Sequence, residues 1–294
     1  MEESPTIVSF LKEIYNIWIT DRPARLAAGL AYYGMFSLVP IVFISLTIAG
    51  IFLDELALAE RLFNVVENVL GSQAATFIEE SVNSMEQTTT GGTFLRSLIS
   101  FIALLLAASG FFFNLQTSLN TIWHVPPPDH DGTRAYIIDK FASFIMVIGV
   151  GILLVATAVL SVLVRFLGSV FPLDFITPVI NLLAFILVVM VSIGLIYKVL
   201  PDVQVSWRDV WLGSLVTTLM MIVGVFIFGW YLTSGSSSSA FEAAGSVAVI
   251  LIGIYTFAQI FLIGAVFTRV YARMFGSLSL NNTNRKSVEG ITDI

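Results

Sequence analysis

The chain has 294 residues, of which 57% are hydrophobic and only 12% are charged. Soluble domains carry about 25% charged residues, so this composition argues against an ordinary water-soluble domain and indicates a protein of the lipid bilayer. The chain has no cysteine, which excludes a disulfide framework, a thiolate metal site and a cysteine nucleophile. Its formal net charge of -6 comes mainly from one loop.

Six segments without a charged residue are long enough to cross a bilayer, for which a helix needs about 20 apolar residues. They predict an all-α fold, a polytopic membrane protein whose membrane domain is a six-helix transmembrane bundle over residues 26–268. The predicted spans are 26–53, 97–123, 141–164, 175–197, 210–232 and 243–268.

Lysine and arginine are distributed unevenly between the alternate loops. Of the fourteen, three lie in residues 1–25, two each in 124–140 and 198–209, and four in 269–294. Loops rich in positive charge are retained in the cytoplasm. The pattern therefore predicts a multi-pass protein with both termini cytoplasmic.

The two ends of the chain differ in pattern. Residues 1–25 are predicted to form a cytoplasmic amphipathic helix, which either lies on the inner membrane interface or packs against the bundle from below. The tail 269–294 is predicted to be cytoplasmic and, because its end is polar and aperiodic, disordered there. The apolar positions at helical spacing near the N-terminus are Ile7, Leu11, Ile14, Tyr15 and Trp18.

The long loop 54–93 is predicted to be external and helical, and it holds seven acidic residues but only one basic residue, Arg61. Such a charge could form an electrostatic vestibule that attracts cations, or it could simply be a solvated surface. The acids that we assign to this external acidic cap are Glu60, Glu67, Glu79 and Glu80.

Uncharged polar residues are the candidates for a site within the bilayer, because the predicted spans contain no charge. Asn114, Gln116 and Asn120 of the second span could line a pathway or could form hydrogen bonds between helices. Gln259 of the last span is a similar candidate for a polar core. Pro40 lacks the amide that the helix would use, so the first span is predicted to kink or open there.

Arg269 and Arg273 follow one another by one helical turn near the inner end of the last span and are predicted to anchor lipid headgroups. His124 and His130 are separated by three prolines, whose extended backbone argues against a metal site. The sequence has none of the common catalytic motifs and no basic stripe for nucleic acid. We therefore expect no cofactor, no enzyme activity and no nucleic-acid partner, with membrane lipids as the partners and a homo-oligomer left open.

The sequence resembles the YihY/BrkB family of six-span bacterial inner-membrane proteins over about residues 10 to 276. The residues that carry this resemblance occur in order along the chain. They are Ala28 to Tyr33 with Phe36 to Pro40, Asn120 to Trp123, Leu200 to Asp202, Trp207 to Val210, Ala243 to Ser246 and Gln259 to Ala265.

The resemblance implies a location in the bacterial cytoplasmic membrane but no well-defined activity, since members have been labelled virulence factor, transporter and ribonuclease BN. We expect a transporter or flippase of a lipid-like or small amphipathic solute. The alternative is a non-transporting membrane scaffold or envelope-integrity factor. A membrane-bound ribonuclease is the least favoured hypothesis. Many relatives have Glu after Gly-Ala in the last span, whereas this chain has Val266. Any role of that acid cannot operate here.

Overall fold

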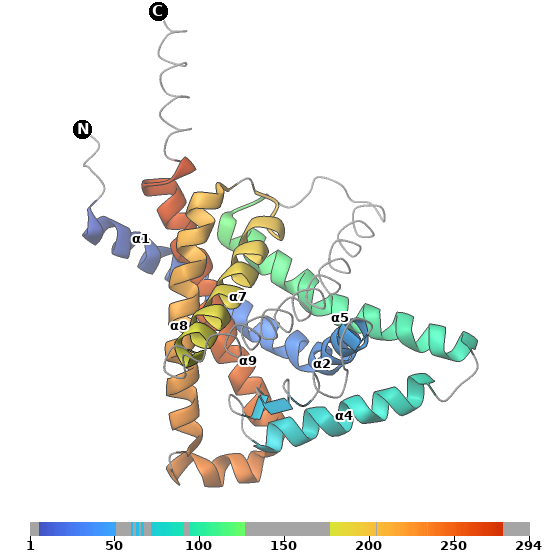
Figure 1. The fold of residues 1–294 in the computed structure, drawn as a ribbon. Coiled ribbons are helices and arrows are strands. Elements are labelled where there is room, and N and C mark those ends of the chain that lie inside the picture. Colours follow the sequence, from blue (N-terminus) through green and yellow to red (C-terminus); the bar gives the residue numbers. More distant parts are fainter. Residues whose placement is uncertain are drawn as a thin grey trace, which may run out of the picture.

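The computed structural model describes residues 6–50, 60, 63–64, 66–67, 72–90, 94–126, 177–203, 205–233 and 235–278. All regular structure in this part is helical, which confirms the all-α class there (Figure 1). The helices are α1 (Ile7–Thr20), α2 (Pro23–Gly50), α4 (Ser72–Thr90), α5 (Phe94–Trp123), α7 (Thr177–Val199), α8 (Trp207–Thr233) and α9 (Gly235–Met274).

Three of the described helices contain a stretch that is long and apolar enough to cross a membrane. These stretches are Pro23–Phe43 of α2, Trp207–Leu232 of α8 and Val247–Met274 of α9. Helices α5 and α7 overlap two further predicted spans, 97–123 and 175–197, and the predicted span 141–164 lies outside the described residues. The described part is thus a helical bundle with three membrane-spanning candidates.

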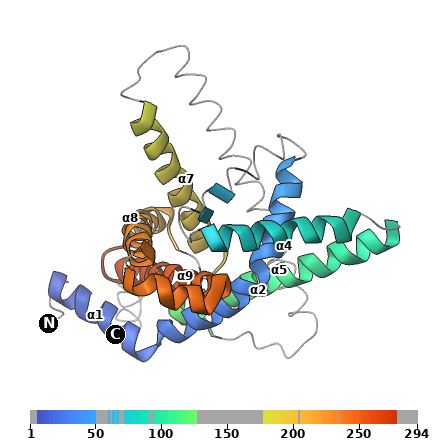
Figure 2. The ribbon, with the colours of Figure 1, turned by 90° about the horizontal axis from the view of Figure 1, so that it is seen from below.

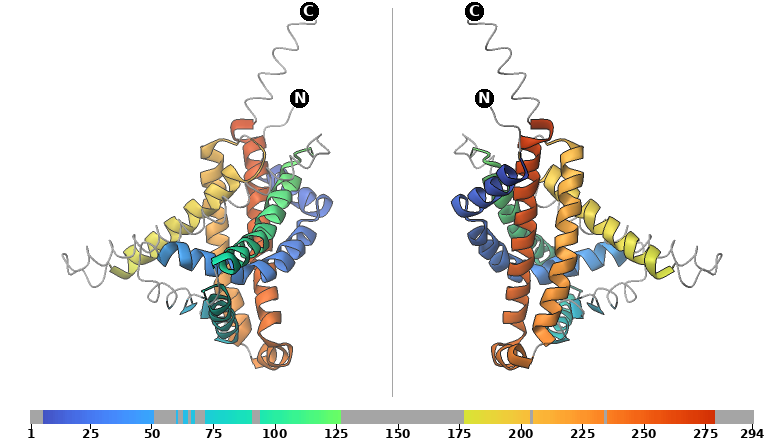
Figure 3. Two further views of the ribbon diagram at one scale, coloured as in Figure 1. Left: turned by 90° about the vertical axis from the view of Figure 1, so that its right-hand side faces the viewer. Right: turned by 90° about the vertical axis from the view of Figure 1, so that its left-hand side faces the viewer.

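Helices α8 and α9 form an antiparallel hairpin along the length of the molecule (Figure 3). At two places a glycine of one helix lies against a threonine of the other. A Cβ added to Gly213 would lie 2.8 Å from Cβ of Thr268, and one added to Gly264 would lie 2.8 Å from Cβ of Thr217. Small residues at this four-residue spacing allow two membrane helices to pack backbone against backbone.

Helix α2 packs against both α5 and α9, and it continues as one helix through Pro40, which is buried. The chain therefore does not unwind at Pro40, and the predicted kink stays a prediction. Leu30 of α2, Leu119 of α5 and Leu262 of α9 are almost completely buried in the shared core.

Helix α4 lies in the predicted external loop and runs beside α5 at the end of the bundle away from α1 (Figure 2). It buries one side, because Ala74, Ile78 and Val82 follow each other at a spacing of four residues. The acids Glu79 and Glu80 lie on exposed positions of this helix. Glu60 and Glu67 are also exposed. A function of these four acids as an electrostatic vestibule stays a prediction.

Candidate functional site

Two features of the bundle are candidates for function. One is an apolar cavity of about 530 Å³ between α2, α5, α7, α8 and α9. The other is a set of hydrogen-bonded polar side chains at the end of the bundle where α5 and α9 terminate, which we call the polar end. The polar end contains Asp21, Gln116, Asn120, His124, Asp202, Asp209 and Arg269.

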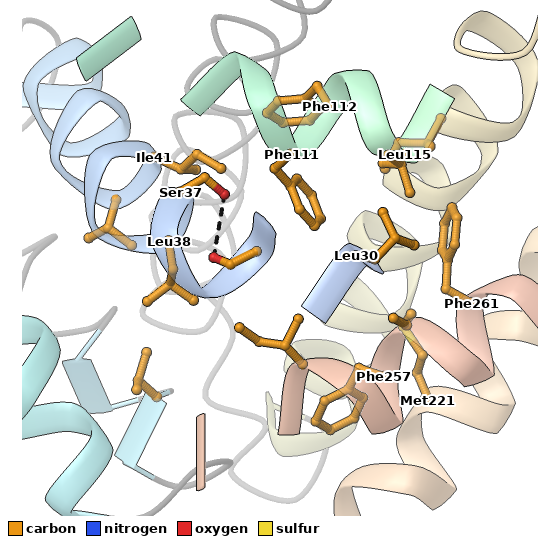
Figure 4. Close-up of a pocket in the computed structure, with 16 residues that line it drawn as sticks. Leu30, Ser37, Leu38, Ile41, Phe111, Phe112, Leu115, Met221, Phe257 and Phe261 are labelled. Carbon is orange, nitrogen blue, oxygen red and sulfur yellow. Dashed lines mark hydrogen bonds between the residues drawn. The ribbon is translucent and has the colours of Figure 1, made fainter. Parts of the chain in front are cut away.

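The cavity is lined almost entirely by hydrocarbon. Figure 4 shows Leu38 and Ile41 of α2 near Phe111 and Phe112 of α5, with Met221 of α8 on the other side of the cavity. Its one polar side chain, Ser37, is turned back to its own helix and donates to the carbonyl of Gly34 at 3.4 Å. The remaining lining residues are Leu30, Val42, Val66, Leu115, Ile196, Ile254, Phe257, Ala258 and Phe261.

Such a lining offers dispersion contacts to an apolar molecule but no charge or free hydrogen-bond donor to a polar one. Pockets of about 300–1,000 Å³ commonly hold small molecules. The residues that we predicted to line a pathway, Asn114, Gln116 and Asn120, are not among the lining residues of this cavity. Gln259 is half-buried and directly follows Ala258, which does line it.

Asn120 connects α5 to the turn between α7 and α8. Its side-chain amide donates to a carboxylate oxygen of Asp202 at 2.7 Å, and its carbonyl accepts from the backbone amide of Asp202 at 2.9 Å. Gln116, one turn earlier on the same face, donates to the same carboxylate oxygen at 3.4 Å. The carbonyl oxygen of Gln116 is buried and has no hydrogen-bond partner among the described residues.

Asn114 behaves differently from Asn120, although both were predicted as pathway residues. Its side-chain amide donates at 3.1 Å to the carbonyl of Gly110 in its own helix. The contacts of Asn120 join α5 to the turn between α7 and α8, and hydrogen bonding between two helices stays a prediction. A role of any of these residues in a pathway stays a prediction.

We expect Asn120→Ala to lower the free energy of unfolding by about 1–3 kcal/mol, because it removes two hydrogen bonds to Asp202 that each contribute about 0.5–1.5 kcal/mol. The matched variant Asn114→Ala should have an effect close to zero, since it removes only a contact within one helix. Equilibrium unfolding of both variants in detergent micelles measures the difference. Equal effects would contradict the connecting role of Asn120.

Arg269 is inside the bundle rather than at its surface, where it was predicted to anchor headgroups. Its side chain is 5% exposed, and it donates to the carboxylate of Asp21 at 3.4 Å and to Nδ1 of His124 at 2.8 Å. A third bond goes to the backbone carbonyl of Ile122. Arg273, one turn further along α9, is exposed, and its contact with headgroups stays a prediction.

The carbonyl of Ile122 is available to Arg269 for a reason that is visible in the sequence. In a continuing helix it would accept from the amide of residue 126, but that residue is Pro126, which has none. Helix α5 ends here, with His124 at φ 52° and the amide of Val125 donating to the carbonyl of Asn120 at 3.0 Å. This left-handed residue closes the helix end and directs the imidazole toward Arg269.

His124 is held between a base and an acid. Because a guanidinium can only donate, Nδ1 accepts from Arg269, so Nε2 carries the proton and donates to Asp21 at 2.7 Å. Both ring nitrogens are thus engaged within the protein. In the sequence, His124 was a candidate metal ligand only together with His130, which lies outside the described residues. Its contacts with Asp21 and Arg269 were not predicted, because these two residues are distant from it in the chain.

A third carboxylate of the polar end fixes the start of α8 to the end of α9. Asp209, which is 3% exposed, accepts from the backbone amide of Ser277 at 3.0 Å and from its hydroxyl at 2.7 Å. Several stretches that carry the sequence resemblance therefore meet at this end, namely 120–123, 200–202 and 207–210. Among the described residues, no three His, Asp or Glu side chains are grouped so that they could hold a metal ion.

Comparison with known proteins shows that the sequence is similar to those of membrane proteins. The family described as virulence factor BrkB matches residues 15–288. A UPF0761 membrane protein of Aggregatibacter aphrophilus is 26% identical over 87% of this chain and 89% of its own length. Another, of Alteromonas mediterranea, is 25% identical over 94% of this chain and 93% of its length. YfkH of Bacillus subtilis, which is named ribonuclease-like, is 24% identical over 87% of this chain and 93% of its own length. No solved structure matches.

Proposed function

Because this chain belongs to the virulence factor BrkB family of membrane proteins, we propose that it is a six-span inner-membrane transporter or flippase for a lipid-like or small amphipathic solute. The family match confirms the resemblance seen in the sequence motifs. The observation that carries the proposal is the partly open apolar cavity of about 530 Å³ between the described helices. A cavity lined by five helices changes shape when those helices move, as alternating access requires.

The chemistry of the cavity favours a hydrocarbon-bearing solute. Its lining contains no charged residue, and burial of an apolar chain there is favourable for the same reason as burial of apolar side chains. An ion or a sugar would lose its hydration and gain no partner from this lining. The polar part of an amphipathic solute would therefore have to remain outside the cavity.

The competing proposal is a membrane scaffold without transport. Its support is the exposed apolar side of α8, where Val223, Phe226 and Trp230 are 55%, 73% and 71% exposed. A face of this kind fits either surrounding lipid or a partner helix. A scaffold has no need of an internal cavity, and for this reason we rank it second.

Six spans with both termini in the cytoplasm complete the proposal. The polar end gathers the start of α2, the ends of α5, α7 and α9 and the start of α8. Since α5 ends there and α7 begins away from it, one further span between them restores the alternation (Figure 1). Residues 141–164 have the composition and length for that span.

We expect reporter fusions to place residue 87, in α4, outside the cytoplasm and residue 278, after α9, inside it. Alkaline phosphatase is active only after export and a green fluorescent protein only in the cytoplasm, so the two reporters give opposite signals at each site. A fluorescent fusion at residue 87, or an active phosphatase at residue 278, would contradict the proposed orientation.

We expect Ala258→Phe to slow solute transfer by about tenfold or more, because a phenyl ring at this lining position fills the cavity. Forcing open an overpacked site costs about 1–3 kcal/mol, which corresponds to about tenfold per 1.4 kcal/mol in rate. The measurement is the movement of a fluorescent phospholipid between the leaflets of proteoliposomes. Val223→Phe, on the exposed side of α8, is the matched control and should transfer lipid at the unchanged rate.

If the unmodified protein moves no lipid above the rate of empty vesicles, the transport proposal fails and the scaffold replaces it.

We further propose that the chain is not an enzyme, although its relative YfkH is named ribonuclease-like. The one acid and histidine pair described here, Asp21 with His124, has no free ring nitrogen to receive a proton from a substrate.

A further inference from the structure

Helix α1 leaves a broad apolar side uncovered by the rest of the described chain. Its five large side chains there follow each other at helical spacing and therefore share one side. They are Ile7, Val8, Leu11, Tyr15 and Ile19, which are 76%, 72%, 59%, 62% and 53% exposed.

The rest of α1 is divided between two other sides. One side packs on the bundle, where the ring of Phe10 meets that of Phe267 edge-on at 5.3 Å and Ile17 is 6% exposed. The remaining side is polar and, together with Val270, Arg273 and Met274 of α9, lines a second pocket. Its residues are Ser9, Lys12, Glu13 and Asn16. The packed side explains how α1 is held, but it leaves the exposed apolar side without a partner.

We propose that the apolar side of α1 lies in the interfacial layer of the bilayer leaflet at the polar end, against an anionic phospholipid surface. Only Asp21 and Arg22 separate α1 from α2, whose membrane-spanning stretch begins at Pro23. Helix α1 also packs against the last turns of α9, and it lies across α9 rather than along it (Figure 1). It is therefore held at the level where two apolar helices leave the bilayer, which is where amphipathic helices bind lipid.

The charges around α1 favour anionic lipid. Among the described residues, four exposed bases surround it, whereas of the two acids near it, Glu13 and Asp21, Asp21 is already hydrogen-bonded to Arg269 and His124. Basic residues at the membrane surface are attracted to anionic headgroups. The same bases disfavour a second copy of the chain, because a symmetric contact would bring like charges together. The bases are Lys12, Arg22, Arg25 and Arg273.

The position of α1 has a consequence for the bundle. Asp21 directly follows the last residue of α1 and shares its carboxylate between Arg269 and His124. Lipid that holds α1 at a fixed depth thereby also holds the junction of α2, α5 and α9.

The chain has no cysteine, so single cysteines can carry spin labels without background. Leu11→Cys and Tyr15→Cys place labels on the apolar side, and Ser9→Cys and Asn16→Cys place matched labels on the polar side. In proteoliposomes with anionic phospholipid, collisions with oxygen report hydrocarbon and collisions with a water-soluble nickel complex report water. We expect the ratio of oxygen to nickel collisions to be several-fold higher at positions 11 and 15 than at positions 9 and 16.

Two results at positions 11 and 15 would overturn the proposal. Protection from both reagents, with dipolar broadening between labelled molecules, would assign the surface to a second copy. Nickel accessibility equal to that of position 16 would place the apolar side of α1 in water.

The preference for anionic lipid is tested by replacing the anionic lipid with phosphatidylcholine, which should move the labels toward water. The double substitution Lys12→Gln with Arg25→Gln should move them in the same way in anionic vesicles. Labels of unchanged depth in both cases would reject the preference for anionic lipid.

Discussion

Replacing Arg269 by methionine is expected to lower the free energy of unfolding by about 3–5 kcal/mol, the usual cost of removing one partner of a buried ion pair. Methionine fills much of the same volume but leaves Nδ1 of His124 and the carbonyl of Ile122 without their donor, and it leaves Asp21 with only the hydrogen bond from Nε2 of His124. The carbonyl cannot recover a helical partner, because Pro126 has no amide. Equilibrium unfolding in micelles measures the loss.

Arg273→Met is the matched control, because it removes the same side chain one turn along α9 at an exposed position. Its effect should stay within about 0.5 kcal/mol, as for most surface substitutions. Arg269→Lys should recover only part of the stability, since a single ammonium group cannot present the planar set of donors of a guanidinium. Equal stability of the Arg269→Met and Arg273→Met variants would show that Arg269 does not hold the polar end together.

We expect Gly264→Ala to destabilise the protein by about 1–3 kcal/mol through overpacking. The new Cβ would overlap the hydroxyl of Thr217 on α8 and lie 2.7 Å from the hydroxyl of Tyr197 on α7. These hydroxyls are 3.1 Å apart, and that of Tyr197 donates to the carbonyl of Phe261 at 2.5 Å. The substitution therefore strains the contacts that join three helices. Thermal unfolding, followed by the loss of the monodisperse protein peak, measures the effect.

The control for Gly264→Ala is Gly229→Ala, which is expected to change the stability in the opposite direction or not at all. At Gly229 of α8 an added Cβ meets no atom within 4 Å, so Gly229→Ala should be neutral or stabilising by up to about 1 kcal/mol, the helix preference of alanine over glycine. Gly213→Ala, which would place its Cβ against Thr268, should behave like Gly264→Ala. Similar unfolding temperatures for the Gly229 and Gly264 variants would contradict the close contact of α8 and α9.

The hydropathy of the sequence predicted spans that overlap described helices, because length and apolar content determine what can cross a bilayer, although α9 begins at Gly235 and not at the predicted residue 243. The predicted starts at residues 26, 97 and 210 all fall three residues inside the observed starts of α2, α5 and α8. The difference has one cause. Each helix begins with a turn that contains a charged residue, and such a turn can lie outside the apolar stretch on which the prediction depends.

The pairing of distant side chains could not be predicted in the same way. Arg269 and Asp21 are 248 residues apart, and Asn120 and Asp202 are 82 apart. Hydropathy describes each helix by itself and contains no information about which helix ends meet. Arg269 was therefore predicted to lie among headgroups, whereas the structure buries it against Asp21, and a headgroup contact of Arg273 stays a prediction.

The sequence predicted polar residues as candidates for lining a pathway, whereas the cavity is lined by apolar residues. Of the three polar residues of α5 that suggested a pathway, Gln116 and Asn120 bond to Asp202 at the polar end, and Asn114 bonds within its own helix. Phe111, Phe112 and Leu115 of the same helix line the cavity instead. A single sequence does not distinguish apolar residues that line a cavity from those that fill a core, because both are hydrophobic at helical spacing.

The most direct test of the proposed function is to ask whether hydrocarbon enters the cavity of the protein in a bilayer. Proteoliposomes would contain a phospholipid with a photoreactive diazirine on its acyl chain, and mass spectrometry would locate the adducts after illumination. The account predicts adducts on lining residues such as Phe111 and Ala258, and it predicts that Leu115→Trp, which fills the cavity, removes them. Adducts confined to outward-facing residues such as Phe226 and Trp230, and unchanged by Leu115→Trp, would contradict it.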